Sequence, residues 1–580
     1  MKRITIFLVL ITLLLSACGQ ASSTTTAAAT TAAQTAAATE AVTTAAQTTA
    51  AAATTAAQTT AAAAATTAAA TTAQPANTPA SDKYGGTLTS TSSSTNSLNP
   101  GMATARMSTW ANLDNIYDQL VTKNENDEFI PMLATDWNIS ADGLTFTFNL
   151  RDDVVFHNGE KFNAEAAKKS IDFYKTAEPN LAGFVADDLR AIEEVVVTGE
   201  YSIELNLSET SGVLLAALGD MGGCMIAPTA IDNYMVALDQ FAIAAGGSGP
   251  FIIDPSATIL EQKYVFNRNP NYWMKDADGN QLPYLDTIIQ MITSDATVNL
   301  NNLFSGDFDF ISIGDMNQIP RIESTPGLIT TISGSINNMR CWFNNGKPPF
   351  DDIKVREAVT WAIDGITIQK VMTGDLGFQL PWIVSPKQSY YVDAPEWVGM
   401  YDVEKSKALL ADAGFPNGFE TELYAASDSA VNMSIAELIQ EQLLAVNIKA
   451  NIVTQDNSSL RAMWALTNPD TPAGMLVWNT NFPRIDAWVQ YSNDFGPATA
   501  NNYGKCLDQE FQDQLLLVKL ESDPAKRDPL LMDLQNIALN KYFLKMLYNH
   551  NAYFAYKDTL KGIAFDFRCM PLWHSVYFEK

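Results

Sequence analysis

Alternating apolar and polar positions predict β-strands in the part of the chain that follows residue 140. Between residues 144 and 150 every second side chain is apolar, which is typical of a strand with one buried face. Asp142-Gly143, just before this stretch, is a turn signal. Residues 195–197 and 201–207 flank the segment Thr198-Gly199-Glu200, and this arrangement predicts a β-hairpin.

Other segments have the spacing of helices and carry capping residues at their ends. Asn163 is placed to cap a helix over residues 164–174. Asp402 is placed to cap a second helix over residues 403–410, and Gly414 is placed to end it. A polar side chain in front of an apolar periodic run satisfies backbone N–H groups that the helix leaves unpaired, so we expect both helices to begin at these residues.

Helices and strands also alternate in the last third of the chain. Residues 437–444 have helical spacing and precede a predicted strand at residues 448–453. A late helix is predicted from Asp523-Pro524 to about residue 544. No repeat of fixed period is evident. The pattern as a whole predicts a mixed fold of the α/β class.

The first residues have the pattern of a secretory signal. Lys2 and Arg3 precede an apolar run over residues 4–15, which is shorter than the roughly 20 residues that span a bilayer. The run ends in Ser16-Ala17 and Cys18, a stretch that resembles the bacterial lipoprotein box. We therefore expect residues 1–17 to be a signal peptide and Cys18 to carry a lipid anchor at the outer face of a membrane. An ordinary signal peptide with an incidental cysteine is the alternative.

The next segment has the composition of a flexible tether. Residues 21–80 are almost wholly Ala, Thr, Gln and Ser, with Glu40 as the one charged residue and no aromatic residue. Such a segment cannot bury enough apolar surface to offset the entropy cost of ordering. We expect residues 18–82 to be a disordered linker, with a reach on the order of 45 Å as a random coil.

Charge and cysteine usage exclude several classes of function. Lys and Arg number 36 against 64 Asp and Glu, a formal net charge of −28, so nucleic acid is not an expected partner. The chain beyond Cys18 has no C-x-x-C pair, and its three histidines lie far apart. These features argue against a metal site, and no cofactor is expected. Four buried thiols are expected, with disulfides left open, at Cys224, Cys341, Cys506 and Cys569.

A series of short phrases beyond the linker resembles one known family. In order, they are Tyr84-Gly85-Gly86-Thr87-Leu88, Ser97-Leu98-Asn99-Pro100, Ile116-Tyr117-Asp118, Pro131-Met132-Leu133-Ala134, Val155-Phe156-His157-Asn158-Gly159, Gly247-Ser248-Gly249-Pro250-Phe251, Asn269-Pro270-Asn271-Tyr272-Trp273, Leu282-Pro283-Tyr284-Leu285-Asp286, Ser305-Gly306-Asp307-Phe308-Asp309, Pro348-Pro349-Phe350, Val355-Arg356-Glu357-Ala358 and Leu409-Leu410-Ala411-Asp412-Ala413-Gly414-Phe415. Together they resemble the family 5 extracellular solute-binding proteins, the peptide-, nickel- and oligosaccharide-binding group that serves ABC importers. The resemblance covers nearly everything from Lys83 to the C-terminus.

The resemblance implies a two-lobed fold like that of the periplasmic binding proteins of type II, with an extra subdomain, mixed sheets, a hinge and an interlobe cleft. By similarity, residues 83–309 would form the N-terminal lobe with an inserted subdomain, and residues 310–556 the second lobe. Residues 557–580 would return to the first lobe. A ligand held between the lobes would favour the closed form by its differential affinity for the two forms.

The resemblance also implies one side of a ligand site. In peptide-binding members, a Trp-x-x-Asp segment packs its tryptophan on the ligand, adds the peptide to its backbone like a strand, and holds the α-ammonium with its aspartate. The matching residues here are Trp478, Asn479, Thr480 and Asn481, so an amide stands in place of the aspartate. Asp486 is a candidate to supply the missing charge. A neutral amide binds an ammonium group less strongly than a carboxylate does.

The other side of the expected site is the loop that follows Asn99-Pro100. Its candidate ligand-binding residues are Thr104, Ala105, Arg106 and Trp110. Arg106 could meet a carboxylate or stack on a sugar face, although an exposed arginine without a ligand explains it equally well. For Trp110 the alternative to ligand binding is a place in the hydrophobic core.

Three functional hypotheses follow. The first is an extracellular substrate-binding lipoprotein of an ABC importer, a monomer on the outer side of the cell membrane that captures a peptide and delivers it to a permease. An oligosaccharide is the rival ligand, favoured by Asn481 and by the inserted segment at residues 278–281. The second hypothesis, a secreted hydrolase, lacks support from motifs such as H-E-x-x-H or G-x-S-x-G, and no catalytic residue is predicted. The third is a tethered adhesin or sensor.

Overall fold

A computed structural model describes residues 82–92, 97–102, 106–124, 128–176, 185–293, 295–386, 388–482, 486–497, 499 and 501–580. The predicted signal peptide, the lipid anchor at Cys18 and most of the linker lie outside these residues. Residues 78–580 form one compact unit. Among the described residues, no helix has both the length and the apolar character that crossing a bilayer requires.

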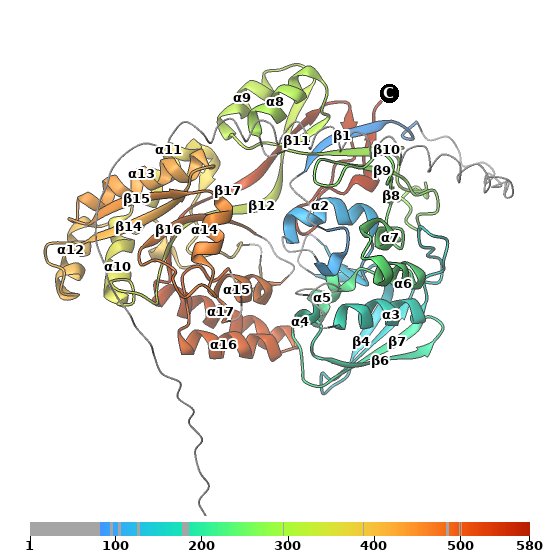
Figure 1. Cartoon of the computed structure of the whole chain (residues 1–580), viewed down its shortest axis with the longest axis horizontal. Helices are drawn as coiled ribbons and strands as arrows, with labels where there is room; N and C mark the ends of the chain where they lie inside the picture. The colour runs from blue at the N-terminus through green and yellow to red at the C-terminus, as the bar shows by residue number, and fades with distance from the viewer. Residues whose placement is uncertain are drawn as a thin grey trace, which may run out of the picture. The chain divides into compact units, whose positions relative to one another are not determined.

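A long mixed sheet runs through the described part of the chain (Figure 1). Its edge strand β15 pairs in parallel with the next strand, β14, whereas its central strands β12 and β17 are antiparallel. In spatial order the strands are β15 (Lys449–Gln455), β14 (Glu420–Ala426), β16 (Met475–Phe482), β12 (Leu328–Phe343), β17 (Leu544–Lys557), β11 (Phe310–Ser312), β1 (Thr87–Ser92), β10 (Thr287–Ile292), β9 (Lys263–Arg268) and β8 (Phe251–Ile253). The short strand β13 (Gly377–Phe378) pairs with β17 outside this order.

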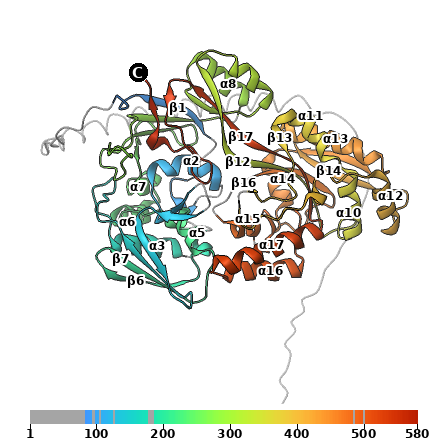
Figure 2. The same ribbon diagram turned by 180° about the vertical axis from the view of Figure 1, so that it is seen from behind.

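Strands β12 and β17 connect the two lobes. At one end they pair from Leu328↔Lys557 to Ile332↔Tyr553, where β17 also pairs with β11, and β11 in turn pairs with β1 of the first lobe. The register shifts after Ile332, and pairing continues from Ile336↔Asn551 into the second lobe. There β16 pairs along the other side of β12. Both views show these two strands crossing the middle of the ribbon (Figures 1 and 2).

The first lobe has an extended hydrophobic core, and a separate four-stranded sheet lies against it. The strands of that sheet are β4 (Ala134–Ile139), β5 (Thr145–Leu150), β7 (Ser202–Leu207) and β6 (Ile192–Gly199). The helices that pack with this core are α2 (Arg106–Ile116), α3 (Ala164–Lys175), α4 (Val185–Asp188), α5 (Leu214–Leu218), α6 (Pro228–Ala237) and α7 (Gln240–Ala244). Leu560, Trp573 and Val576 near the C-terminus are buried in the same core.

The second lobe has a hydrophobic core on each face of its sheet. Met339, Cys341 and Phe343 of β12 point into one core, and Trp342 points into the other. Helices α10 (Ile353–Ala362), α11 (Gly365–Thr373), α12 (Val403–Asp412) and α13 (Ala430–Leu444) cover the first core. Helices α14 (Asn457–Trp464), α15 (Ala487–Phe495), α16 (Gln509–Leu520) and α17 (Pro524–Asn540) cover the second. The exact residue boundaries of the lobes stay a prediction.

Most of the predicted elements are confirmed. Strand β5 and the antiparallel hairpin of β6 and β7 lie where alternation placed them. Asn163 accepts from the backbone N–H of Ala166 at the start of α3, and Asp402 caps α12 in the same way. The late helix was predicted too long, because α17 ends at Asn540 and Leu544 begins β17. Pairing of Leu544 with Trp342 of β12 outweighs the local helical spacing.

Cys224, Cys341, Cys506 and Cys569 are buried, and none of these four forms a disulfide in the part of the chain that the structure describes, so the prediction of buried thiols is confirmed. Burial raises the pKa of each of the three thiols at Cys224, Cys341 and Cys506, which keeps them protonated and unreactive.

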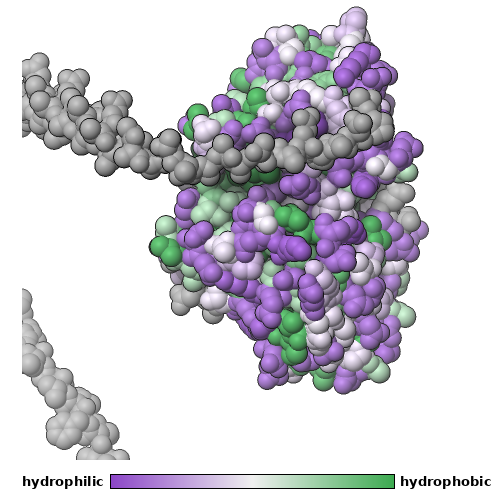
Figure 3. Space-filling view, turned by 90° about the vertical axis from the view of Figure 1, so that its right-hand side faces the viewer, coloured by the Kyte–Doolittle hydropathy of each residue, from purple (hydrophilic) through white to green (hydrophobic). Residues whose placement is uncertain are grey.

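The outer surface is more polar than the cores. On the face drawn in Figure 3, hydrophilic residues predominate and apolar residues are scattered among them.

Asp118 joins three segments in the interior of the first lobe. Its carboxylate accepts hydrogen bonds from the Tyr272 hydroxyl (3.1 Å), the Trp273 Nε1 (3.0 Å) and the Ser248 hydroxyl (3.0 Å). The side chain is buried, and that burial raises the pKa of Asp118 to about 6 in spite of these donors. The charge of Asp118 is therefore costly in the folded protein.

We expect Asp118→Asn to change how stability depends on pH. A folded pKa above the unfolded value of about 3.9 gives a contribution that is complete below pH 4 and is lost as the pH rises to about 6. The lost contribution is on the order of 2–3 kcal/mol. Urea unfolding of wild type and variant between pH 4 and pH 7 measures it. A difference between the two proteins that stays constant over this range contradicts the expectation.

Candidate functional site

Trp478 lies in the middle of β16 and is packed inside the second lobe. Only 4% of its surface is exposed. Its ring and the Tyr503 ring are packed edge to face with their centroids 5.4 Å apart, and the Arg461 guanidinium lies over the indole at 5.2 Å from its centroid. A cation over an indole face and a perpendicular ring at the edge are both favourable arrangements. The indole is therefore held in one orientation by its own lobe, and its contact with ligand stays a prediction.

The backbone that follows Trp478 lies at an open edge. Strand β16 pairs with β12 along its whole length, from Met475 to Phe482. Its other side pairs with β14 only at Met475 and Leu476. Within the described strand pairings, residues 477–482 therefore have no strand on that side. Asn479 is exposed there, while the side chains of Thr480 and Asn481 lie outside the described residues.

The expected partners in the first lobe are described only in part. Thr104 and Ala105 lie outside the described residues, and of Arg106 only the backbone is described, as the first residue of α2. Trp110 is 1% exposed, its Nε1 donates to Asp220 Oδ1 (2.7 Å), and the Arg568 guanidinium covers its ring at 3.8 Å. Trp110 thus lies in the core of the first lobe, and its contact with ligand stays a prediction.

Asp486 is engaged in another interaction, and this weighs against it as a replacement for the missing aspartate. Its two carboxylate oxygens accept from Arg527 Nη1 (2.6 Å) and Nη2 (2.7 Å). It also accepts from the backbone N–H of Trp488 as the N-cap of α15. Burial by itself would raise the pKa of Asp486, but Arg527 holds that pKa below its usual value.

The two lobes touch at the side of α16. The Gly212 N–H donates to the Lys519 carbonyl at 2.8 Å. A Cβ atom at Gly212 would lie 1.9 Å from the Glu521 carbonyl oxygen, so the approach requires glycine. Lys123 of the first lobe also helps to lower the pKa of Asp486 in the second. Residues of both lobes thus meet on the side of α15 and α16.

A buried polar group that the sequence analysis missed lies on the same face of the sheet as Trp478. Arg340 of β12 is 0% exposed, and its Nη1 donates to Asp494 Oδ2 of α15 at 2.7 Å. Asn338, two residues before it, pairs in register with Asn549 of β17, and both are buried. The signal in the sequence is a polar residue at positions 338 and 340, where the alternation of β12 calls for apolar side chains.

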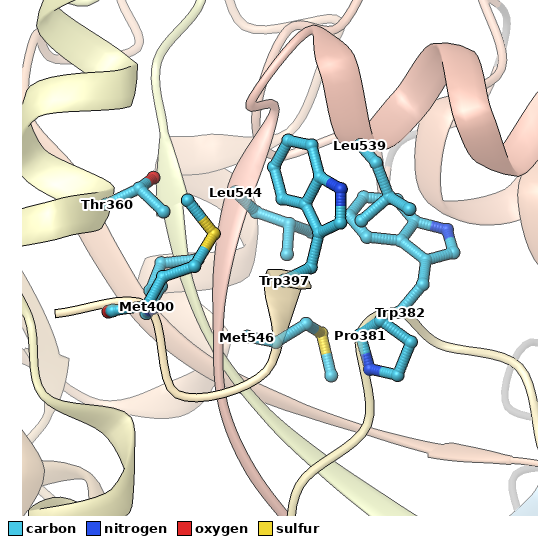
Figure 4. A pocket seen from close by; sticks show the side chains of 9 residues that line it. Thr360, Pro381, Trp382, Trp397, Met400, Leu539, Leu544 and Met546 are labelled. Carbon is cyan, nitrogen blue, oxygen red and sulfur yellow. The ribbon is translucent and has the colours of Figure 1, made fainter. Parts of the chain in front are cut away.

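A small pocket opens elsewhere on the second lobe. It is lined by Thr360, Pro381, Trp382, Trp397, Met400, Leu539, Leu544, Lys545 and Met546. In Figure 4 the two indoles and two methionine side chains converge on it. Lys545 is buried there, donates to the Met400 carbonyl at 3.0 Å, and has a pKa that burial lowers to about 8. The lining is apolar apart from Thr360 and Lys545.

Acid–base and metal chemistry find little support in the described part of the chain. It has no cluster of three or more His, Cys, Asp or Glu placed to hold a metal ion. His157 and His574 have pKa values that burial lowers to about 4. The arrangement instead supplies packed aromatic rings, an open strand edge and a buried guanidinium, which are features of recognition by non-covalent contacts.

Comparison with known proteins gives one family. The family model for bacterial extracellular solute-binding proteins, family 5 middle, matches residues 128–499. The glutathione-binding protein GsiB of Escherichia coli strain K12 is 25% identical over 414 residues, which cover 70% of this chain and 78% of GsiB. Heme-binding protein A of Haemophilus influenzae is 28% identical over 399 residues, covering 64% of this chain and 70% of that protein.

A solved structure has the same fold. It is the periplasmic binding protein DppA of Helicobacter pylori in complex with the peptide STSA. The TM-score is 0.72 at 22% sequence identity, and the match covers 86% of this chain and 99% of DppA. At this level of identity the likeness concerns the fold. The predicted fold class, a two-lobed mixed α/β binding protein, is therefore confirmed.

Proposed function

Because the family match spans more than half of the chain, the protein belongs to the bacterial extracellular solute-binding proteins of family 5, and we propose that it captures a short peptide for an ABC importer. In this proposal the chain is a lipoprotein, tethered through Cys18 and the linker to the outer face of the cell membrane. It acts as a monomer, hands its solute unchanged to a permease, and catalyses no reaction.

The open edge of β16 is the observation that carries the peptide assignment. An extended peptide beside residues 477–482 would continue the sheet, since main-chain N–H and C=O groups on that side have no strand to pair with in the described part. Main-chain pairing of this kind tolerates varied side chains. GsiB is named for glutathione and the DppA structure holds a peptide, and both ligands offer such a backbone.

The paired strands β12 and β17 support capture by closure. They are the long connection between the lobes, and their register shifts between Ile332 and Ile336. A local irregularity in two strands is a place where a small change in backbone angles moves one lobe against the other. A ligand that contacts both lobes would then favour the closed form.

An oligosaccharide is the second candidate. Asn481 in place of an aspartate removes the charge that would hold a peptide α-ammonium, and Asp486 is bound to Arg527. The binding of a neutral ligand does not depend on a charge at position 481, so the asparagine there does not weaken it. The segment around residues 278–281 is longer than in the family pattern. A ligand other than a peptide would also explain this extra length. Peptide stays the first assignment because the strand edge favours a backbone.

We expect the correct ligand class to stabilise the protein strongly. Ligand at a hundredfold its dissociation constant adds about 2.7 kcal/mol to the free energy of unfolding. A thermal-shift screen of di- to pentapeptides and of neutral oligosaccharides separates the candidates, and small-angle scattering of the same samples reports closure.

A shift with the sugars alone assigns the oligosaccharide and rejects the peptide. Hydrolysis of a ligand by purified protein would reject the binding-protein assignment itself. The variant Asn479→Gly is a matched control for binding at the strand edge. It removes a side chain but keeps the backbone donors and acceptors, so it is expected to retain peptide binding.

A further inference from the structure

Arg340 is the buried cation whose hydrogen-bonding capacity is least satisfied among the described arginines. Its Nη1 is bound to Asp494, but Nε and Nη2 have no partner although they are buried. By contrast, every nitrogen of Arg527 is bound, to Asp486 and to the Val518 carbonyl. Buried polar atoms are normally paired, because an unpaired buried donor loses its hydrogen bonds to water and gains none in return.

The unpaired nitrogens are on one edge of the guanidinium. Nε and Nη2 lie side by side, and this edge binds both oxygens of a carboxylate in a two-pronged contact. Asp494 cannot turn to fill it, because its Oδ2 already accepts from Arg340 Nη1 and from Gln490 Nε2 (2.6 Å), and its Oδ1 accepts from Asn493 Nδ2 (3.0 Å). The protein thus fixes one side of the guanidinium and leaves the other side for a further acceptor.

Two more side chains next to Arg340 lack partners. Asn338 and Asn549 are 1% and 0% exposed, and both the amide nitrogen and the amide oxygen of each are unpaired. They face each other across β12 and β17, and Asn338 shares its face of β12 with Arg340. Arg340, Asn338 and Asn549, here called the Arg340 group, therefore concentrate unpaired donors and acceptors at one point of an otherwise apolar face.

The Arg340 group lies where the two lobes join. Asn338 and Asn549 are next to the register shift at Ile336 that separates the two halves of the long strands. Strand β16, with its open edge, pairs directly with this part of β12, at Asn338↔Thr480 and Arg340↔Trp478. Helix α15, which carries Asp494, lies on the side of the second lobe that faces α5 in both ribbon views (Figures 1 and 2).

We propose that the Arg340 group is a subsite for a carboxylate of the bound solute, which receives the free edge of Arg340 while Asn338 and Asn549 bind the polar groups next to it. The inference rests on the proposed function, since it specifies the chemistry of the solute in that same site. The solute is then an acid, and a free peptide C-terminus or a sugar acid both meet this requirement. The Arg340–Asp494 pair is neutral by itself, so the third group brings the negative charge.

Matched acid and neutral probes test the subsite. The probes are trialanine and trialanine amide for the peptide source, and cellobionic acid and cellobiose for the sugar source. Calorimetric titration of the wild-type protein is expected to show at least tenfold tighter binding of the acid within the pair that binds, since charge-assisted hydrogen bonds are roughly twice as strong as neutral ones. Which pair binds identifies the source of the carboxylate.

Variants test whether the preference for the acid probe depends on Arg340. The double change Arg340→Gln with Asp494→Asn removes both charges together, so no unpaired buried charge is created, and it is expected to bring the acid-to-neutral ratio close to one. Arg527→Gln with Asp486→Asn is the matched control, because it removes a second buried Arg–Asp pair whose donors are all satisfied. The control is expected to keep the wild-type ratio. Circular dichroism verifies folding of each variant.

The ratio of acid to neutral affinity in the wild-type protein tests the subsite even if a variant fails to fold. Equal binding of acid and neutral probes overturns the subsite and leaves the proposed function standing. A tenfold ratio that survives in the Arg340→Gln, Asp494→Asn variant places the carboxylate elsewhere and also overturns it. A crystal structure in which ordered waters alone bridge the Arg340 group in the ligand-bound protein would have the same consequence. Binding of none of the four probes counts against both proposals.

Discussion

Asp486→Ala is expected to lower the free energy of unfolding by about 3–5 kcal/mol. The change leaves the Arg527 guanidinium buried with its charge uncompensated, since both of its Nη atoms are bound to the Asp486 carboxylate. It also removes the N-cap of α15, which is worth about 1 kcal/mol. Urea unfolding at pH 7, followed by circular dichroism, measures the loss.

The matched control is Asp456→Ala. Asp456 caps α14 through the backbone N–H of Ser459, as Asp486 caps α15, but it is exposed. A loss of about 1 kcal/mol is expected there. If the two variants lose the same amount, the ion pair with Arg527 contributes nothing beyond the cap, contrary to our expectation.

The cost of Asp486→Ala has a defined dependence on pH. Arg527 lowers the folded pKa of Asp486 below its ordinary value of about 3.9, although burial opposes it. The stabilising contribution is therefore present above pH 4 and is lost as the pH falls through the folded pKa. The difference between wild type and variant should narrow in acid and should not narrow between pH 6 and pH 8.

Arg568→Met is expected to have an effect of similar size, about 3–5 kcal/mol, on the first lobe. Arg568 Nη2 donates to both oxygens of Asp114 (2.7 and 2.9 Å), and its Nε donates to Asp566 Oδ2 (2.6 Å). Its guanidinium also covers the Trp110 ring. Its loss leaves two largely buried carboxylates without a cation and removes an ion pair between the C-terminal segment and α2.

Arg151→Met is the matched control for Arg568. Arg151 likewise lies over an indole, that of Trp273 at 4.2 Å, and pairs with a carboxylate, that of Asp153 at 2.7 Å. Both partners of this ion pair are partly or largely exposed, so a loss below about 1 kcal/mol is expected. Equal losses in Arg568→Met and Arg151→Met would show that burial of the Arg568 cluster does not set its contribution.

The loss of unfolding free energy in Arg568→Met should grow as the pH rises. Burial raises the pKa of Asp114 to about 7 even with Arg568 beside it, so removal of the cation raises that pKa further. A raised folded pKa gives stability that is lost as the pH rises through it. We expect a larger difference from wild type at pH 8 than at pH 5, measured by thermal unfolding.

The sequence by itself determined the local elements and the family. Asn163 and Asp402 cap their helices as predicted, because a cap depends on backbone groups within three residues. The hairpin of β6 and β7 is equally local. A dozen phrases in a fixed order indicated the family, and with it the two-lobed fold, although each phrase alone says little.

Only the tertiary structure decided which side chains are available at the candidate site. Trp110 and Trp478 are both aromatic residues near expected ligand loops, yet both are buried. Arg568 of the C-terminal segment covers Trp110, and Arg461 and Tyr503 pack against Trp478. The alternation of β12 marks Arg340 as unusual but does not reveal that Asp494, 154 residues away, binds just one of its nitrogens. Such pairings depend on long-range packing, which gives no periodic or short-range signal in a sequence.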